Sequence, residues 1–468
     1  MSRWFDRALF ALLLTLAMFG AGAIGCLLAH VAVPDWLLPA CAVVAVLVPR
    51  RTTLPPASRS APPRARIAAA ATLAVLVAAL AYGSLATASR HWDGAVAWDA
   101  KAQRLADAPT LEQPYFRDTN VFCHSRDYPL LQPVLIATIE RSTGAGRLVF
   151  VLAFAIAVAA LGLALLRRTG DERIALGATL AFALTPNLVN PTSGGFDSGY
   201  ADGLLCACIT VAAAGVIAGD RIWLALGLFL AVLTKPEGLP YGGAFVAAVW
   251  LVGDGGMLRA ATVGWLAAAT LQLSLQHDLA TNGTERALPL LLIGCAVLGA
   301  AVLGSDRWLV RRAGDARLRT RLGLLMVALL LVVGPLLAAC VGDVAGSFGA
   351  YLNAPSRLWS RLERLPAVLA GFGEFALWRG AFGLTWLLPP CLWLLTRRLP
   401  NDKARRVLGV AMLLFVAVWI AAFLLSPIED LQHHLRSTLP RLLDHATGAA
   451  WLFSAACWHR LCAASQPH

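Results

Sequence analysis

Residues 148–166 read LVFVLAFAIAVAALGLALL, a run of nineteen residues without a charged side chain. As a helix this run is about 28 Å long, close to the ~30 Å hydrocarbon layer of a membrane. Lipid offers no partner for an unpaired backbone group, so a segment that crosses the layer alone must be helical. The stretch therefore predicts a transmembrane helix, and similar runs recur along the chain.

The overall composition agrees with this interpretation. Of the 468 residues, 58% are hydrophobic and only 14% are charged, and the mean hydropathy is +0.68. A soluble chain carries about a quarter of its residues as charged. We predict an all-α polytopic membrane protein with a bundle of about 11–14 transmembrane helices. The predicted spans are residues 8–31, 36–49, 67–88, 148–166, 174–190, 200–218, 222–234, 240–253, 258–275, 287–304, 321–342, 380–396, 406–425 and 441–458.

The net charge of +12 does not indicate a nucleic-acid partner. Most basic residues lie in short loops between apolar runs, as the positive-inside rule requires of cytoplasmic loops. We expect such loops at 50–66, which begins with Arg50, and at 305–321 and 397–406. The ten cysteines are scattered along apolar runs and predict neither a disulfide framework nor a metal site.

Residues 128–142, YPLLQPVLIATIERS, decide the topology, because the segment is apolar but short and contains two prolines. If it spans the membrane, Arg167 and the C-terminus lie outside. If it lies along the surface, the dense arginine clusters and both termini lie inside. We adopt the second alternative. The chain then divides into N-terminal spans (1–88), a long periplasmic loop with juxtamembrane helices (89–147), a transmembrane bundle (148–342), a second periplasmic loop (343–379) and C-terminal spans (380–468).

The first outer loop carries the segment HWDGAVAWDAKAQRL from residue 91, which contains Asp93, Asp99 and Lys101. Only three of the 39 basic residues are lysines, and two of them, Lys101 and Lys235, lie in polar segments predicted to face outward. The compact lysine ammonium can hold a phosphate as a point charge. The alternative for Lys101 is an ordinary solvated loop lysine.

Three further segments place a carboxylate at the outer end of a span. They are CHSRDYPLLQP with Asp127, SGGFDSGYADGLL with Asp202, and TKPEGLPYGG with Glu237. Ionisable groups at this depth are costly to bury, which favours a functional role. The alternatives are a helix-packing hydrogen bond for Asp202 and a local ion pair with Lys235 for Glu237.

The last outer loop reads SPIEDLQHHLRSTLPRLL from residue 426 and brings His434 and Arg441 to the mouth of the final span. A basic cluster there can hold a phosphate and stabilise the charge that develops on it as a leaving group. The alternative is interfacial snorkelling of these side chains.

These segments together resemble the GT-C glycosyltransferases, which are membrane enzymes that use polyprenyl-phosphate sugars. The family includes the protein O-mannosyltransferases and the aminoarabinose transferase of lipid A, and the likeness is to a bacterial branch without a characterised member. The elements that carry the resemblance are WDGAVAWDAKA, RDYPLLQP, GYADGLL, LTKPEGLP and PIEDLQHHLRSTLPRLL. The last element departs from the family pattern, because Ser437 and Thr438 stand in the reverse of the usual order.

The resemblance implies a GT-C-like fold and inverting, metal-independent transfer of a sugar, with no cofactor beside the lipid-linked donor. It implies an active site on the periplasmic side of the bacterial inner membrane, and a glycan, lipid or protein as acceptor. By motif position the catalytic base is Asp93, with Asp99 as the second choice. Lys101 would bind the lipid phosphate.

By looser analogy, Lys235 and Arg441 would also bind that phosphate, with His434 as a further candidate. Asp127 and Asp202 would orient sugar hydroxyls or the basic residues. Two other functions stay open: a flippase for lipid-linked glycans or another secondary transporter, and a non-catalytic membrane scaffold. A transporter is expected to carry charges near the bilayer midplane and symmetry between its halves.

Overall fold

The regular elements in the part of the chain that the computed structural model describes are all helices, and that part forms no strand, so the all-α prediction is confirmed there. The structure describes residues 2–50, 59–86, 93–118, 120–123, 125–189, 195–196, 198–281, 299–300, 304, 360–400, 402–426 and 428–465.

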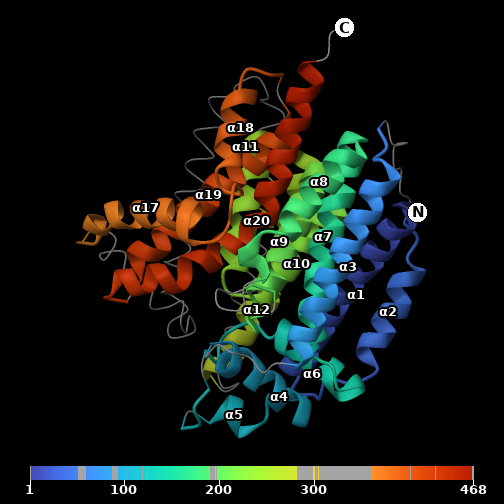
Figure 1. The fold of residues 1–468 in the computed structure, drawn as a ribbon. Helices are drawn as coiled ribbons and strands as arrows, with labels where there is room; N and C mark the ends of the chain where they lie inside the picture. Colours follow the sequence, from blue (N-terminus) through green and yellow to red (C-terminus); the bar gives the residue numbers. More distant parts are fainter. Residues whose placement is uncertain are drawn as a thin grey trace.

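The helices run mostly side by side and form an elongated bundle (Figure 1). The first half contains α1 (Ser2–Leu28), α2 (Leu37–Leu47), α3 (Pro63–Ala86), the π-helical turn η1 (Gly94–Asp99), α4 (Ala100–Asp107), α5 (Pro114–Arg117), α6 (Leu131–Thr143), α7 (Leu148–Thr169), α8 (Glu172–Ala183), η2 (Pro186–Val189), α9 (Asp202–Ala218), α10 (Arg221–Thr234), α11 (Gly238–Val252) and α12 (Gly255–Thr281). The second half contains η4 (Leu362–Arg364), α17 (Leu365–Glu374), η5 (Phe375–Arg379), α18 (Leu388–Thr396), α19 (Lys403–Leu425) and α20 (Leu431–Ala464).

Four helices of the described chain are long and apolar enough to cross a membrane by length and composition: Trp4–Leu28, Pro63–Ala86, Leu148–Thr169 and Lys403–Leu425. Four other predicted spans correspond to the shorter apolar helices α2, α9, α10 and α11. The predicted spans 258–275 and 441–458 lie inside α12 and α20, and α18 covers only part of 380–396. The predicted spans 287–304 and 321–342 lie almost entirely outside the described residues.

The segment that decides the topology forms α6, together with the turn before it. This helix has 13 residues and is therefore about 20 Å long, shorter than a hydrocarbon layer. Figure 1 shows α4, α5 and α6 together at one end of the bundle, away from the C-terminus. Arg141 at the end of α6 donates to Asp35 (2.8 Å) and to the carbonyl of Leu105 (2.8 Å), which ties α6 to this end.

Helix α9 is the centre of the bundle, and its residues from Asp202 to Ile217 are buried. Glycines on neighbouring helices permit the close packing around it. A Cβ at Gly227 of α10 would come within 2.5 Å of the Ala212 backbone nitrogen, and one at Gly448 of α20 would overlap the side chain of Thr210. Because α20 lies so close to α9, polar side chains on the same face of α20 reach the start of α9.

Candidate functional site

The centre of the candidate site is the carboxylate of Asp202, the first residue of α9, which is 0% exposed. Its Oδ1 accepts hydrogen bonds from Lys235 Nζ (2.6 Å) and His445 Nε2 (2.5 Å). Its Oδ2 accepts one from Arg441 Nε (2.9 Å). Burial of a charge among apolar helices is costly unless it is paired and hydrogen-bonded. We use the name Asp202 cluster for Asp202, its cationic partners Lys235 and Arg441, and the two carboxylates paired with these cations, Asp93 and Glu237.

Local sequence explains how each partner reaches Asp202. Lys235 caps the C-terminus of α10 in an extended conformation, since the following Pro236 disfavours helical geometry at the residue before it. Arg441 and His445 are four residues apart on α20, so they lie one above the other on the same face. Asp202 itself occupies the first turn of α9, where the helix dipole stabilises a negative charge.

Two more carboxylates form the exposed rim of the cluster. Asp93 Oδ2 lies 3.1 Å from Arg441 Nη1, and Glu237 Oε1 lies 2.9 Å from Lys235 Nζ. The side chains of Asp93 and Glu237 are 36% and 31% exposed, whereas their cationic partners are mostly covered. The completed Asp202 cluster therefore has three carboxylates and two cations, and it opens to the surface beside Asp93 and Glu237.

An aromatic wall lies beside the cluster. The guanidinium carbon of Arg441 lies 4.0 Å from the ring centroid of Tyr200, a cation–π contact. Tyr200 packs with Trp98, and Trp98 packs against Tyr128 with ring centroids 5.7 Å apart. The wall therefore joins the segments around residues 98, 128 and 200 to Arg441.

A buried hydrogen-bond chain reaches Asp202 from inside the bundle. Trp419 Nε1 donates to the Tyr241 hydroxyl (2.7 Å), and this hydroxyl lies 3.0 Å from His445 Nδ1. The Asp202 carboxylate can only accept, so we assign the proton of the neutral imidazole to Nε2, which donates to Asp202. Nδ1 then accepts from the Tyr241 hydroxyl. This chain holds the carboxylate in a fixed orientation.

Lys101 is fully buried beneath the aromatic wall. Its Nζ donates to the carbonyl of Ser125 and lies 6.0 Å and 5.6 Å from the ring centroids of Trp98 and Tyr128. Burial lowers the pKa of Lys101 to about 8. In this conformation the ammonium is covered, so contact with a phosphate requires the wall to open.

Asp99 and Asp127 lie apart from the Asp202 contacts. Asp99 Oδ2 is 3.9 Å from Arg147 Nη1, and burial raises the pKa of Asp99 to about 6. Asp127 is half-buried, and its backbone carbonyl accepts from Gln276 Nε2 (3.2 Å).

His434 lies seven residues before Arg441 on α20, on the same face and about 10 Å along the axis. Its ring packs edge-on against Phe423, with centroids 4.8 Å apart. Burial lowers the pKa of His434 to about 4, so the side chain is neutral at pH 7 and supplies no cation for a phosphate.

The structure thus brings together five of the nine predicted site residues: Asp93, Asp202, Lys235, Glu237 and Arg441. Asp99, Lys101, Asp127 and His434 surround or flank them without joining the ion pairs described above. Sequence reasoning missed Tyr241, Trp419 and His445. A signal for His445 is present, since Asp444 and His445 are ionisable residues in the predicted final span.

Among the described residues, no group of three or more His, Cys, Asp or Glu side chains is arranged to hold a metal ion. Comparisons of the chain with protein-family models, with curated proteins and with solved structures find no match.

Proposed function

We propose that the chain is a multi-pass GT-C-type glycosyltransferase of a bacterial inner membrane. It would transfer a sugar from a polyprenyl phosphate to an acceptor hydroxyl on the periplasmic side. The observation that carries this proposal is the Asp202 cluster, in which four motif segments far apart in the chain supply one set of ion pairs. A charged cluster open at one end of an apolar bundle suits a substrate whose phosphate lies at headgroup depth.

The charge balance of the cluster supports a role for Asp93 as the base. Three carboxylates already share two cations, so a donor phosphate must displace a carboxylate to bind. Asp93 is the most exposed of the three, and its Oδ2 accepts from Arg441 Nη1 (3.1 Å). In the proposed mechanism the phosphate replaces Asp93 on Arg441, and the Asp93 carboxylate then accepts a proton.

The transfer step then follows from these positions. Asp93 takes the proton of the acceptor hydroxyl, and the acceptor oxygen attacks the anomeric carbon from the face opposite the phosphate. The bond between the anomeric carbon and the phosphate oxygen breaks, and polyprenyl phosphate leaves with the electron pair. Arg441 and Lys235 stabilise the charge that develops on the leaving oxygen. Asp202 is buried beneath both cations and acts as a positioning residue.

The test is transfer from a radiolabelled polyprenyl-phosphate sugar by the purified chain in proteoliposomes. Asp93→Asn should abolish transfer and leave expression and membrane insertion intact, because the variant keeps the shape of the side chain but cannot accept the proton. Asp107→Asn is the matched control, since Asp107 is an exposed carboxylate in the same loop. Full transfer by Asp93→Asn would refute the assignment of the base.

Asp99→Asn separates the two candidate bases. Asp99 pairs with Arg147 and has no contact with Arg441 among the contacts described above, so this variant should retain transfer. If Asp99→Asn loses transfer while Asp93→Asn keeps it, Asp99 is the base.

A second candidate function is a proton-coupled transporter of lipid-linked glycans, and Asp444 favours it. This carboxyl is buried in α20, accepts from Asn187 Nδ2 (2.8 Å), and forms no ion pair with a described residue. Uncompensated carboxyls inside a bundle are typical of proton relays. A transporter would move the labelled donor across the proteoliposome membrane without forming a labelled product, and Asp444→Asn would block that movement.

A further inference from the structure

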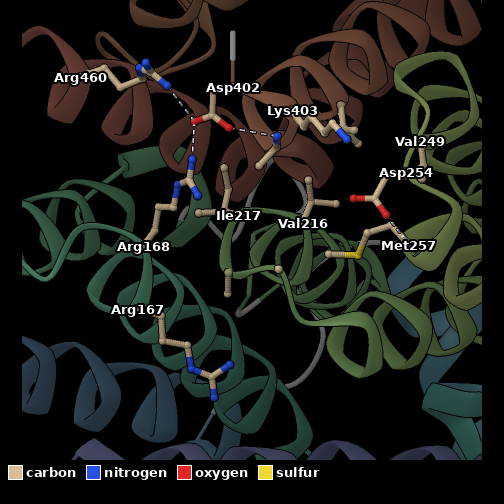
Figure 2. A pocket seen from close by; sticks show the side chains of 14 residues that line it. Arg167, Arg168, Val216, Ile217, Val249, Asp254, Met257, Asp402, Lys403 and Arg460 are labelled. Atoms are coloured by element: carbon tan, nitrogen blue, oxygen red, sulfur yellow. Dashed lines mark hydrogen bonds and ion pairs between the residues drawn. The ribbon is translucent and has the colours of Figure 1, made fainter. Parts of the chain in front are cut away.

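A cavity of about 470 Å³ lies beyond the end of α9 that is farther from Asp202. The last turn of α9 lines the cavity with Val216, Ile217 and Ala218. These residues lie about 25 Å from Asp202 along the helix axis. The last turn of α7, Val249 of α11, the first turns of α12 and α19, and Arg460 of α20 also line the cavity (Figure 2). This volume falls in the range of small-molecule binding sites.

Part of the cavity lining is charged. Figure 2 shows Arg168 and Arg460 converging on Asp402. Arg168 Nη2 lies 2.6 Å from Asp402 Oδ2, whereas Arg460 Nη1 is 3.6 Å away, which is too long for a hydrogen bond. The two arginine side chains are 40% and 27% exposed. A guanidinium has five N–H donors, so both arginines keep donors for a ligand.

The cavity carries an excess of one positive charge. Lys403 lines it and forms no ion pair with a described residue, which adds a third available cation. Arg167 points away from Asp402 in Figure 2, because it pairs with Asp6 and with Asp220 Oδ2 (2.8 Å). Three cations thus face two carboxylates, Asp402 and Asp254, of which Asp254 caps α12 through the Met257 nitrogen (3.1 Å).

The rest of the lining is largely apolar and includes Val216, Ile217, Val249, Met257 and Val407. A small free anion would use only the charged side chains. A ligand with a phosphate and an adjoining hydrocarbon chain would contact both kinds of side chain and bury apolar surface at about 25 cal/mol per Å².

We propose that this cavity binds the headgroup of an anionic phospholipid. The phosphate would contact Arg168, Arg460 and Lys403, and the first carbons of the acyl chains would lie against the valines. The cavity lies where α7 ends and α19 begins, and both are helices long enough to cross a membrane, so a bilayer crossed by these two helices would place it at headgroup depth. Basic pockets between helices at this level bind lipid phosphates. The proposal does not depend on glycosyl transfer.

The test is lipid binding by the delipidated full chain in detergent, followed by native mass spectrometry and by the thermal unfolding midpoint. The probes are phosphatidylglycerol, phosphatidylcholine and inorganic phosphate. Phosphatidylglycerol should bind about tenfold more tightly than phosphatidylcholine and raise the midpoint, and inorganic phosphate at the same concentration should have little effect.

Two variants locate the site. Arg168→Gln and Lys403→Gln should each weaken phosphatidylglycerol binding by about tenfold, the loss of one charge-assisted hydrogen bond. Lys403→Gln breaks no ion pair with a described residue, so it tests the site even if Arg168→Gln perturbs folding. Arg436→Gln is the control, because Arg436 is an exposed arginine more than twenty residues before Arg460 on α20.

Equal binding of phosphatidylglycerol and phosphatidylcholine would overturn the proposal, and so would equal stabilisation by inorganic phosphate. Unchanged phosphatidylglycerol binding in Lys403→Gln would also overturn it. A selective loss of phosphatidylglycerol binding in both variants, with the Arg436 variant unaffected, would support it.

Discussion

Helix α9 separates two buried charge clusters of different character. At its start, the Asp202 cluster combines three carboxylates with two cations and opens beside Asp93 and Glu237. Beyond its end, Asp6 and Asp220 share Arg50 and Arg167, and all four side chains are 15% exposed or less.

The second cluster is balanced in charge and closed. Arg167 and Arg50 also lie over the ring of Trp223, at 4.5 Å and 5.4 Å from its centroid. Asp220 caps α10 by accepting from the nitrogens of Ile222 and Trp223. Every member thus has a structural partner. Buried charge is therefore common to both clusters, and the Asp202 cluster differs from the second one in its unequal charge balance and its exposed rim, the two features on which the proposed site rests.

The largest expected effect is that of Asp202→Asn. The substitution leaves Lys235 and Arg441 buried without their common carboxylate, which costs about 3–5 kcal/mol of unfolding free energy. We expect the lower end of this range, because Glu237 and Asp93 each remain beside one cation. Denaturant unfolding in detergent measures the loss, and transfer should disappear with it. A loss below about 1 kcal/mol would show that the cluster is not a buried unit.

Asp6→Asn applies the same change to the balanced cluster. The expected loss of unfolding free energy is about 2 kcal/mol, since Asp220 still pairs with both arginines. Transfer per folded molecule should stay unchanged, because this cluster lies beyond the opposite end of α9. Activity assays normalised to folded protein measure it. A loss of transfer as large as that in Asp202→Asn would remove the distinction between the two clusters.

Lys101→Met tests the boundary of the site through the pH dependence of the unfolding free energy. Burial lowers the pKa of Lys101 from 10.5 to about 8. Between these values the unfolded chain keeps a proton that the folded chain has lost, so the unfolding free energy of the parent protein rises with pH through this window. The variant lacks that contribution. Its unfolding free energy, measured at several pH values and subtracted from that of the parent, should reveal the rise, and parallel curves would contradict it.

Local sequence predicts the helices well, because each long apolar run has one low-cost arrangement for its backbone groups in an apolar environment. Residues 148–166, for example, lie entirely within α7. The sequence also suggested a local ion pair with Lys235 as the alternative to a functional role for Glu237, because the two residues are two positions apart. The structure contains this ion pair. The hydrogen bonds that Asp202 makes across the bundle match the packing alternative as well.

The long-range pairing of the site was not predictable in the same way. The position of Arg441 on Asp202 depends on how closely α20 packs on α9, which a glycine at 448 permits and which no local pattern reveals. Lys101 was singled out for its rarity, but its burial arises from the aromatic rings of Trp98 and Tyr128. Arg50 was expected in a basic loop and instead lies buried between two aspartates.

The place of α20 as the last described helix sets the order in which the Asp202 cluster is completed. Arg441 lies 239 residues after Asp202, and ribosomes add roughly 5–20 residues each second, so the helix emerges about 12–48 s later. From the synthesis of Lys235, 33 residues after Asp202, until that of Arg441, Lys235 is the only one of the three donors to Asp202 that is present. A nascent chain that stops before α20 would hold the Asp202 carboxylate at the start of α9 with one of these three donors, and packing of α20 against α9 would complete its hydrogen bonds.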